Sequence, residues 1–275
     1  MTVLAVDLGG TKLLVALVNE HRVLNRIEAP MDRDAGPDAW LAQIADMAAP
    51  WSGKYDRIGV TVTGLVQDGT WSALNPATLD IPPQYPLANR ASAALGVKPT
   101  LRNDAQAAAW GEHLFGAGAR RDMVFLTIST GVGGGIVAGG QLLSGRSGMA
   151  GHFGQTLPPD GSATRIEDAV SGRWMAKAAR AAGHDVDARG VFAAAGATWA
   201  DAILDNSAAR IARLCQNLQF VLDPSLFVIG GGIGLAPGYI ERIEAHLDVP
   251  RRPILARAAL GADAGIIGIA ALACE

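Results

Sequence analysis

The sequence predicts an α/β protein of two lobes that repeat one structural pattern. An apolar strand, a glycine-rich turn and a second strand occur around residue 9, and the same unit recurs around residue 131. Helices and further strands follow each unit, as expected for a duplicated α/β fold. A length of 275 residues is long for one hydrophobic core and suits two modest ones.

Composition excludes several classes of protein. Hydrophobic residues make up 49% of the chain, so disorder is not expected, and a net charge of -3 gives no reason to expect a nucleic-acid or membrane partner. No apolar run approaches the ~18 residues of a membrane span, and no secretory leader is recognisable after Met1. Cys215 and Cys274 are too few for a disulfide framework. We therefore expect a cytoplasmic location.

Hydrophobic patterning predicts the elements of the first lobe. We expect the stretch 67–86 to be irregular because of its prolines. The strand expected at 57–63 ends at Gly64. The expected elements are strands at 2–7, 13–18 and 23–28, a helix at 37–49, a strand at 57–63, a helix at 87–95, a strand at 98–102 and a helix at 105–115.

The first glycine turn, Asp7-Leu8-Gly9-Gly10-Thr11-Lys12, has the residues of a phosphate site. Gly9 and Gly10 have no Cβ, so a polyphosphate can approach the backbone closely. Thr11 adds a hydroxyl and Lys12 a positive charge, and Asp7 at a strand end is placed to orient Mg²⁺ through water. Taken alone, the turn is equally consistent with a structural hairpin.

The pair Asn103-Asp104 stands between a predicted strand and a predicted helix. One interpretation is a helix N-cap, with Gln106 as the capping-box partner of Asn103. The other is catalytic, because a carboxylate at the carboxyl end of a strand can accept a proton from a bound hydroxyl. A phosphate cradle and a carboxylate base are together what phosphoryl transfer to an alcohol requires.

The second lobe repeats the unit and adds long helices. The turn is expected at 130–135, and Gly230-Gly231-Gly232-Ile233-Gly234 forms a third glycine loop after a strand. The expected elements are strands at 123–129 and 136–138, a helix at 164–182 with a Thr164–Glu167 capping box, a helix at 201–222, a strand at 226–229 and an apolar helix at 262–272. We expect lobes at 1–104 and 105–258, with 259–275 packing back on the first lobe.

Three further polar residues are candidates for contacts to a substrate. His152 lies in a glycine-rich loop, where solvation is an equally good interpretation. Glu167 also fits a capping box alone, and Asn75 fits a turn residue before Pro76. A buried sugar hydroxyl requires a charged or amide partner, which these side chains supply.

Four motifs in order resemble the ROK family (repressors, open reading frames, kinases) of the sugar kinase/Hsp70/actin superfamily. They are Asp7-Leu8-Gly9-Gly10-Thr11-Lys12, Asn103-Asp104-Ala105, Ile128-Ser129-Thr130-Gly131-Val132-Gly133-Gly134-Gly135 and Gly230-Gly231-Gly232-Ile233. The resemblance covers nearly the whole chain. It implies a two-lobed actin-like, ribonuclease-H-like ATPase fold, a homodimer, and a kinase that uses ATP and Mg²⁺ on a hexose or hexosamine. The repressor branch is not expected, since no helix-turn-helix precedes Asp7.

The resemblance also implies roles for individual residues. Asp104 is the general base, and the sugar contacts come from Gly64, Asn75, Asn103, His152 and Glu167. The nucleotide and its phosphates contact Asp7, Gly9, Gly10, Thr11, Lys12, Thr130, Gly131, Gly231 and Gly232, with Mg²⁺ near Asp7.

The chain departs from the family pattern in one loop. His152 stands where most relatives have a glutamate, Gln155 replaces the usual histidine, and the cysteine-rich zinc segment is reduced to residues 158–163. Zinc needs thiolate or imidazole ligands, so no zinc site is expected.

The sequence of the same loop indicates which substrate to expect. Gly148-Met149-Ala150-Gly151-His152-Phe153-Gly154 is most similar to bacterial N-acetylmannosamine kinases, so 6-phosphorylation of N-acetylmannosamine is the first expectation. A glucokinase or another hexose or N-acetylglucosamine kinase is the alternative within the family. A non-catalytic sugar-binding sensor is the alternative of another class, favoured by the altered loop and opposed by the intact Asp7 and Asp104.

Overall fold

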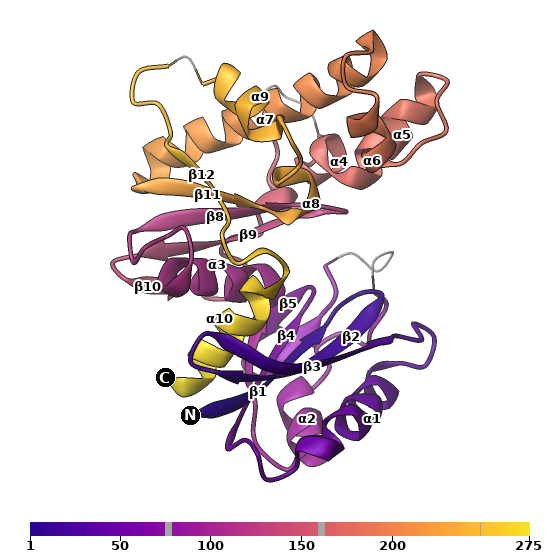
Figure 1. The fold of residues 1–275 in the computed structure, drawn as a ribbon, viewed down its shortest axis with the longest axis vertical. Helices are drawn as coiled ribbons and strands as arrows, with labels where there is room; N and C mark the ends of the chain where they lie inside the picture. Colours follow the sequence, from indigo (N-terminus) through magenta and orange to yellow (C-terminus); the bar gives the residue numbers. More distant parts are fainter. Residues whose placement is uncertain (75–78, 159–162, 248) are drawn as a thin grey trace.

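The computed structural model describes residues 1–74, 79–158, 163–247 and 249–275. The candidate sugar residue Asn75 lies outside these ranges. Figure 1 shows two α/β lobes one above the other, with both chain termini beside the lower lobe. The prediction of a two-lobed α/β fold is confirmed.

The first lobe is built on a five-stranded sheet of order β3-β2-β1-β4-β7. Its strands are β1 (Thr2–Leu8), β2 (Lys12–Asn19), β3 (Arg22–Pro30), β4 (Arg57–Val62) and β7 (Thr100–Asn103). Helices α1 (Pro37–Ala48) and α2 (Leu87–Leu95) cover the face away from the other lobe (Figure 1). There α1 buries Trp40, Leu41 and Ile44 against the sheet, because these residues recur at helical spacing.

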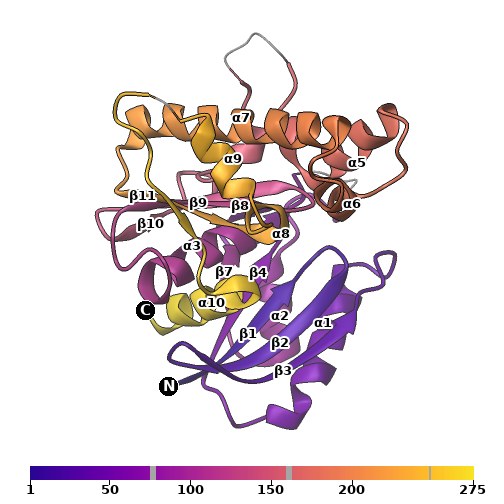
Figure 2. The same cartoon turned by 45° about the horizontal axis from the view of Figure 1, so that its top comes forward.

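The second lobe repeats this arrangement with a sheet of order β10-β9-β8-β11-β12. Its strands are β8 (Met123–Ile128), β9 (Val132–Ala138), β10 (Gln141–Leu143), β11 (Leu226–Gly230) and β12 (Leu255–Arg257). Its outer helices are α4 (Glu167–Val170), α5 (Gly172–Ala181), α6 (Ala188–Ala193), α7 (Thr198–Leu222), α8 (Gly231–Gly234) and α9 (Tyr239–Ala245). Figure 2 shows α7 lying across the outer side of this lobe. In each sheet the first strand of the lobe pairs antiparallel with the next strand in the chain and parallel with a later one. This shared topology confirms the internal duplication.

Two helices, α3 (Asp104–Phe115) and α10 (Ala264–Cys274), lie between the sheets (Figure 2). With the facing sides of β1, β2, β8 and β11 they form a hydrophobic core of their own. The helices cross at small residues: a Cβ on Gly111 would lie 2.5 Å from the carbonyl oxygen of Ala264. Short 3₁₀ turns complete the described structure at Ala49–Trp51, Phe153–Gln155 and Gly261–Asp263.

A fully buried carboxylate ties the end of α3 to the segment that enters α10. Glu112 Oε2 accepts the backbone N–H of Ala117 at 2.9 Å and of Ala259 at 3.0 Å. Its Oε1 accepts the N–H of Leu260 at 2.7 Å. Three charge-assisted hydrogen bonds offset the desolvation of this carboxylate and fix the junction between the lobes.

Several local expectations were wrong. The stretch 164–182 is two helices, because Ser171 caps α5 by accepting the N–H of Trp174 at 3.4 Å. A hairpin of β5 (Leu65–Gln67) and β6 (Thr70–Ser72) extends into the stretch 67–86 that was expected to be irregular. Gly133, Gly134 and Gly135 lie within β9 rather than in the turn. They are glycines there because α3 and Phe153 pack closely; a Cβ on Gly135 would lie 2.5 Å from that of Ala109.

Among the described residues, no helix is long and apolar enough to cross a membrane.

Candidate active site

The carboxyl ends of three neighbouring parallel strands bring polar side chains to one edge of the first sheet. Asp7 on β1 pairs in register with Thr61 on β4, whose Oγ1 donates to Asp7 Oδ1 at 2.9 Å. Val62 on β4 pairs in register with Asn103 on β7, and Asp104 follows directly. Ligands in open α/β sheets bind at such strand ends.

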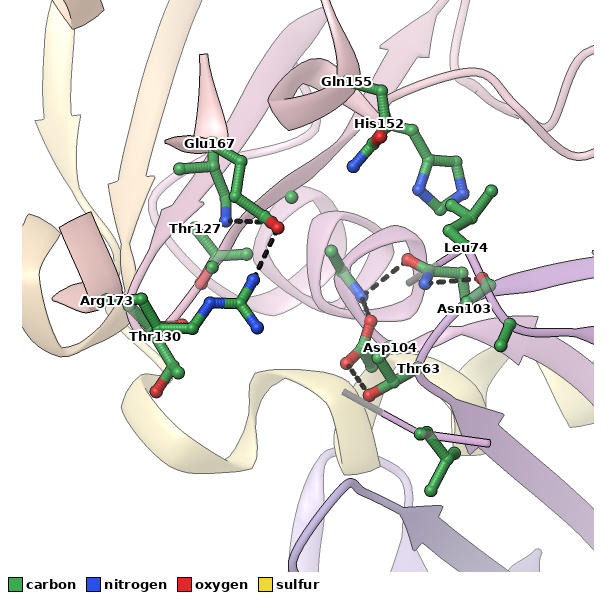
Figure 3. Close-up of a pocket in the computed structure, with 18 residues that line it drawn as sticks. Thr63, Leu74, Asn103, Asp104, Thr127, Thr130, His152, Gln155, Glu167 and Arg173 are labelled. Atoms are coloured by element: carbon green, nitrogen blue, oxygen red, sulfur yellow. Dashed lines mark hydrogen bonds and ion pairs between the residues drawn. The ribbon is translucent and has the colours of Figure 1, made fainter. Parts of the chain in front are cut away.

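Asp104 is held by two donors and points into a cleft. Thr63 Oγ1 donates to Asp104 Oδ2 at 3.0 Å, and the N–H of Ala105 donates to Oδ1 at 2.8 Å (Figure 3). Burial raises the pKa of this carboxyl above its ordinary value, while the bonds from Ala105 and Thr63 act in the opposite direction. A carboxylate with a raised pKa is a better proton acceptor for a substrate hydroxyl.

Asn103 is the N-cap of α3. Its Oδ1 accepts the N–H groups of Ala105 at 3.0 Å and Gln106 at 3.2 Å. Its Nδ2 donates to the carbonyl oxygen of Gly64 at 3.0 Å, so the buried amide joins the helix start to the cleft wall. The expected capping box is wrong, because Gln106 Nε2 instead donates to the carbonyl oxygens of Gly148 and Ala150. Contact of Asn103 with a sugar stays a prediction.

The cleft around Asp104 is a cavity of 240 Å³ lined by both lobes. Figure 3 shows Thr63, Asn103 and Asp104 on one side, with His152, Gln155 and Glu167 across from them. The polar or glycine residues that line it are Thr63, Gly64, Asn103, Asp104, Thr127, Ser129, Thr130, Gly131, Gly133, His152, Gln155, Glu167 and Arg173. Most of the residues that the sequence predicted for the sugar site therefore meet in one cavity.

Glu167 belongs to this cleft rather than to a capping box. Its Oε2 accepts the N–H of Val132 at 3.0 Å, and its Oε1 forms an ion pair with Arg173 at 2.6 Å. The prediction of a Thr164–Glu167 box is therefore wrong. A Cβ on Gly131 would lie 2.6 Å from Glu167 Oε2, so glycine is required for this carboxylate to approach the turn.

His152 is half-buried rather than fully solvated. A ring nitrogen donates to the carbonyl oxygen of Gly148, and Nε2 is buried with no hydrogen-bond partner among the described residues. The donor is therefore Nδ1, and in the neutral ring the buried Nε2 is an acceptor that has no partner among the described residues. Burial lowers the pKa of His152 below its ordinary value, which favours the neutral ring.

The first glycine turn is tight. The N–H of Gly9 donates to the carbonyl oxygen of Lys12 at 3.2 Å, and Thr11 accepts from the N–H of Met31. Lys12 Nζ forms an ion pair with Glu28 on β3 at 2.9 Å, and both side chains are exposed. The ammonium group of Lys12 therefore lies beside β3 in this structure. Contacts of Gly9, Gly10, Thr11 and Lys12 with phosphate stay a prediction.

A second cavity adjoins the first through Ser129, Thr130 and Arg173. Its far wall is the start of α8 at Gly232 and Ile233, together with α5 and α6. Gly231 has a φ of 84°, and a Cβ there would lie 2.7 Å from the backbone of Ile128. The third glycine loop thus brings α8 close to the end of β8, directly before the second glycine turn.

Comparison with known proteins decides the family. The sequence model of the ROK family matches residues 3–275. The chain belongs to the ROK family.

Individual ROK proteins are similar over most or all of the chain. The bifunctional enzyme NanE/NanK of Brucella melitensis is 50% identical over 98% of this chain, which spans about half (54%) of that relative. An N-acetylmannosamine kinase of Salmonella typhimurium is 39% identical over 99% of this chain and 98% of its own. The crystal structure of a ROK hexokinase from Thermus thermophilus superposes with a TM-score of 0.86 at 31% identity, covering 100% of this chain and 98% of that one.

Three residues of this ROK cleft were missed at the sequence level. Thr63 orients Asp104, Arg173 pairs with Glu167, and Gln155 lines the cavity. The only available signals were the position of Thr63 at a strand end and of Arg173 directly after Ser171-Gly172. Neither signal says which partner the side chain reaches.

The charges of Asp7 and Asp104 repel each other. Burial, followed by the charge of Asp104, raises the pKa of Asp7 from 3.8 to about 6. A bound cation would relieve this repulsion, and Mg²⁺ commonly uses one or two carboxylates with water and phosphate oxygens. Among the described residues, no cluster of three or more His, Cys, Asp or Glu side chains is arranged to hold a metal.

We expect Asp7→Asn to stabilise the metal-free protein at pH 8. Because the folded pKa of Asp7 exceeds its unfolded value, the stability gained by protonation is complete below pH 3.8 and lost as pH rises through about 6. A shift of this size corresponds to about 1–3 kcal/mol. Urea unfolding in EDTA should show the variant more stable than wild type at pH 8 and no more stable at pH 4.

Asp122→Asn is the control of opposite sign. The N–H groups of Gly139 and Gly140 lower the pKa of Asp122, so its neutral variant should lose stability at pH 8. An Asp7→Asn variant that is less stable than wild type at pH 8 would show that the hydrogen bond from Thr61 outweighs the burial of the charge.

Proposed function

We propose that this protein is an ATP-dependent kinase that phosphorylates the 6-hydroxyl of N-acetylmannosamine. The observation that carries the proposal is Asp104, a carboxylate with a raised pKa, held by two donors in a cleft between the lobes. Membership of the ROK family and the similarity to the Salmonella typhimurium kinase support the reaction and the substrate. The similarity to NanE/NanK supports the same choice for the half of that enzyme that the chain matches.

In the proposed reaction the sugar binds in the cavity of Asp104, with ATP in the adjoining one. Asp104 accepts the proton of the 6-hydroxyl as that oxygen attacks the γ-phosphorus, and the bond to the departing ADP oxygen breaks. Thr63 and Ala105 hold the carboxylate in position for this transfer. Mg²⁺, when bound near Asp7, neutralises phosphate charge. Positioning and exclusion of water supply most of the acceleration.

The turn Ser129–Gly131 is proposed to contact the phosphates of ATP. The N–H of Ser129 donates to the carbonyl oxygen of Gly131 at 2.9 Å, and Gly172 N–H donates to Ser129 at 2.8 Å, so the turn is fixed against α5. Thr130 lines both cavities and therefore lies where the phosphoryl group passes between the substrates. Gly231 and Gly232 are proposed to lie beside the nucleoside.

His152 is proposed to select the sugar. Its neutral ring offers the free acceptor Nε2 to a sugar hydroxyl or to an acetamido N–H, whereas Glu167 offers a carboxylate. The 2-hydroxyl of glucose and the acetamido N–H of N-acetylmannosamine are both donors but point in different directions, so an acceptor fixed at one position selects between the two sugars.

We expect wild type to prefer N-acetylmannosamine over glucose in kcat/KM, and His152→Ala to reduce that preference. Loss of one neutral hydrogen bond in the bound state should cost about 0.5–1.5 kcal/mol, which is roughly 2–12-fold. The measurement is kcat/KM for both sugars on wild type, His152→Ala and Glu167→Gln. The glutamine variant should weaken both sugars alike.

Two outcomes would contradict these assignments. If glucose is the better substrate of the wild-type enzyme, the sugar is a hexose, as the similarity to the Thermus thermophilus hexokinase would allow. If His152→Ala weakens both sugars equally, His152 only shapes its loop.

The proposed activity itself is tested by coupled detection of ADP with a panel of hexoses and hexosamines. Sugar-dependent ADP release supports a kinase. A saturable change in intrinsic fluorescence on sugar binding, without ADP release for any sugar, would indicate a sensor instead.

A further inference from the structure

A third cavity, of 510 Å³, lies between the lobes and is lined by residues that are all different from those around Asp104. The first lobe contributes the β5–β6 hairpin, the first turn of α2 and the segment 98–102. The second lobe contributes residues 144–146 and 148, and Gln106 on α3 lies between them. A ligand in this cavity would therefore contact both lobes at once.

The lining of this cavity is positively charged. Lys98, Arg102 and Arg146 line it with a single acidic residue, Asp68. Within the residues that the structure describes, none of these three cations forms an ion pair. The Nε of Arg102 is buried with no hydrogen-bond partner there, although Nη1 donates to the carbonyl oxygen of Leu101 at 2.9 Å. A buried guanidinium N–H without a partner is costly unless an acceptor reaches it.

The backbone adds to this positive potential. The first turn of α2, at Ala88 and Asn89, lines the cavity, and the amino end of a helix carries partial positive charge, although the N–H of Ala88 already donates to the carbonyl oxygen of Gly69 at 2.9 Å. Clustered guanidinium and ammonium groups beside a helix start suit phosphate, because its oxygens accept several charge-assisted hydrogen bonds.

We propose that this cavity binds a phosphate-bearing anion, either inorganic phosphate or a small phosphomonoester, that bridges the two lobes. Arg102 and Lys98 contact it from the first lobe and Arg146 from the second. The site is separate from the cleft in which the sugar and ATP are proposed to react.

The same segment connects the anion site to the reaction cleft. Residues 144–148 line the anion cavity, and the carbonyl oxygen of Gly148 accepts from Gln106 Nε2 at 3.1 Å and from the ring of His152. Gly148 also packs on the backbone of Val66 and has a φ of 78°. An anion held by Arg146 and Arg102 therefore fixes the segment that carries His152 against the first lobe.

Isothermal titration of inorganic phosphate at constant ionic strength tests the proposal. The test variant is Lys98→Gln combined with Arg146→Gln, both exposed side chains whose loss should leave the fold intact. The matched control is Arg22→Gln, an exposed arginine on β3 at the opposite edge of the sheet from β7. Phosphate should bind wild type and the control equally and the double variant about tenfold or more weakly.

Hydrogen exchange gives a second measurement. Phosphate should slow exchange in residues 144–152 of wild type and not of the double variant. A parallel titration with glycerol 3-phosphate distinguishes the ligands: tighter binding than phosphate indicates a phosphomonoester, and weaker binding indicates phosphate itself.

The proposal is overturned if wild type shows no saturable binding of either anion. It is also overturned if the double variant binds phosphate as wild type does, since that binding would then belong to the cleft of Asp104. These results do not depend on kinase activity, so they leave the proposed function to its own test.

Discussion

Asp104→Asn should lower kcat by about 10²–10⁴-fold, which is the usual contribution of a positioned general base. Asparagine keeps the shape of the side chain, and its Oδ1 can still accept the N–H of Ala105. The amide cannot take the proton of the sugar hydroxyl, so turnover is lost while binding is kept. Single-turnover rates and calorimetric binding of the sugar, measured on the same preparation, separate the two effects.

Thr63→Val is the control that distinguishes a base from a helix cap. Thr63 Oγ1 donates to Asp104 Oδ2 at 3.0 Å and thereby lowers the pKa of this carboxyl. Its loss should raise that pKa further, so the rising limb of kcat/KM against pH should move to higher pH. The plateau at high pH should change little.

The result that would contradict the assignment is also specific. An Asp104→Asn enzyme that keeps more than about a third of wild-type kcat could not have lost a general base, given the range above. Asp104 would then serve only to start α3, together with the Asn103 cap.

The parts of the fold that the sequence predicted are those with local signals. The Asn103 cap and the glycine turn at Gly9 each act within a few residues of their own position. The continuous apolar runs of β1 and β2 report only that both faces of these strands are buried. Such signals located the strands of the first sheet, the first two helices, α3 and α7 to within a few residues, whereas β10 and β12 of the second sheet were not predicted.

The parts that were missed depend on residues far apart in the chain. Glu167 reaches Val132, 35 positions away, so its side chain is unavailable for a capping box. Gln106 leaves the helix start because the carbonyls of Gly148 and Ala150 lie within its reach. The burial of His152 follows from the same loop packing on the second sheet. No spacing in the sequence encodes these partners.

The second large prediction concerns the crossing of α3 and α10. We expect Gly268→Ala to remove much of the protein's free energy of unfolding. A Cβ on Gly268 would overlap the carbonyl oxygen of Ala107 and lie 2.7 Å from its carbonyl carbon and 2.8 Å from the backbone nitrogen of Gly111. All three atoms are backbone, so no side chain can rotate away. The two helices would have to separate within the interlobe core.

Gly265→Ala on the same helix is the matched control. Its Cβ would lie 3.7 Å from the carbonyl oxygen of Asp104, an ordinary contact, and alanine is favoured over glycine in a helix by about 1 kcal/mol. Gly268→Ala should cost about 3 kcal/mol or more, the upper range for overpacking, and lower the Tm by roughly 5–10 °C. Gly265→Ala should leave the Tm unchanged or raise it.

Urea unfolding and thermal melts compare the stabilities of the two variants. Equal stabilities would mean that α3 and α10 slide freely past each other. Unequal stabilities in the expected order would mean that this crossing fixes the start of α3. Because Asp104 is the first residue of α3, the backbone contact at Gly268 would then also set the position of the proposed base.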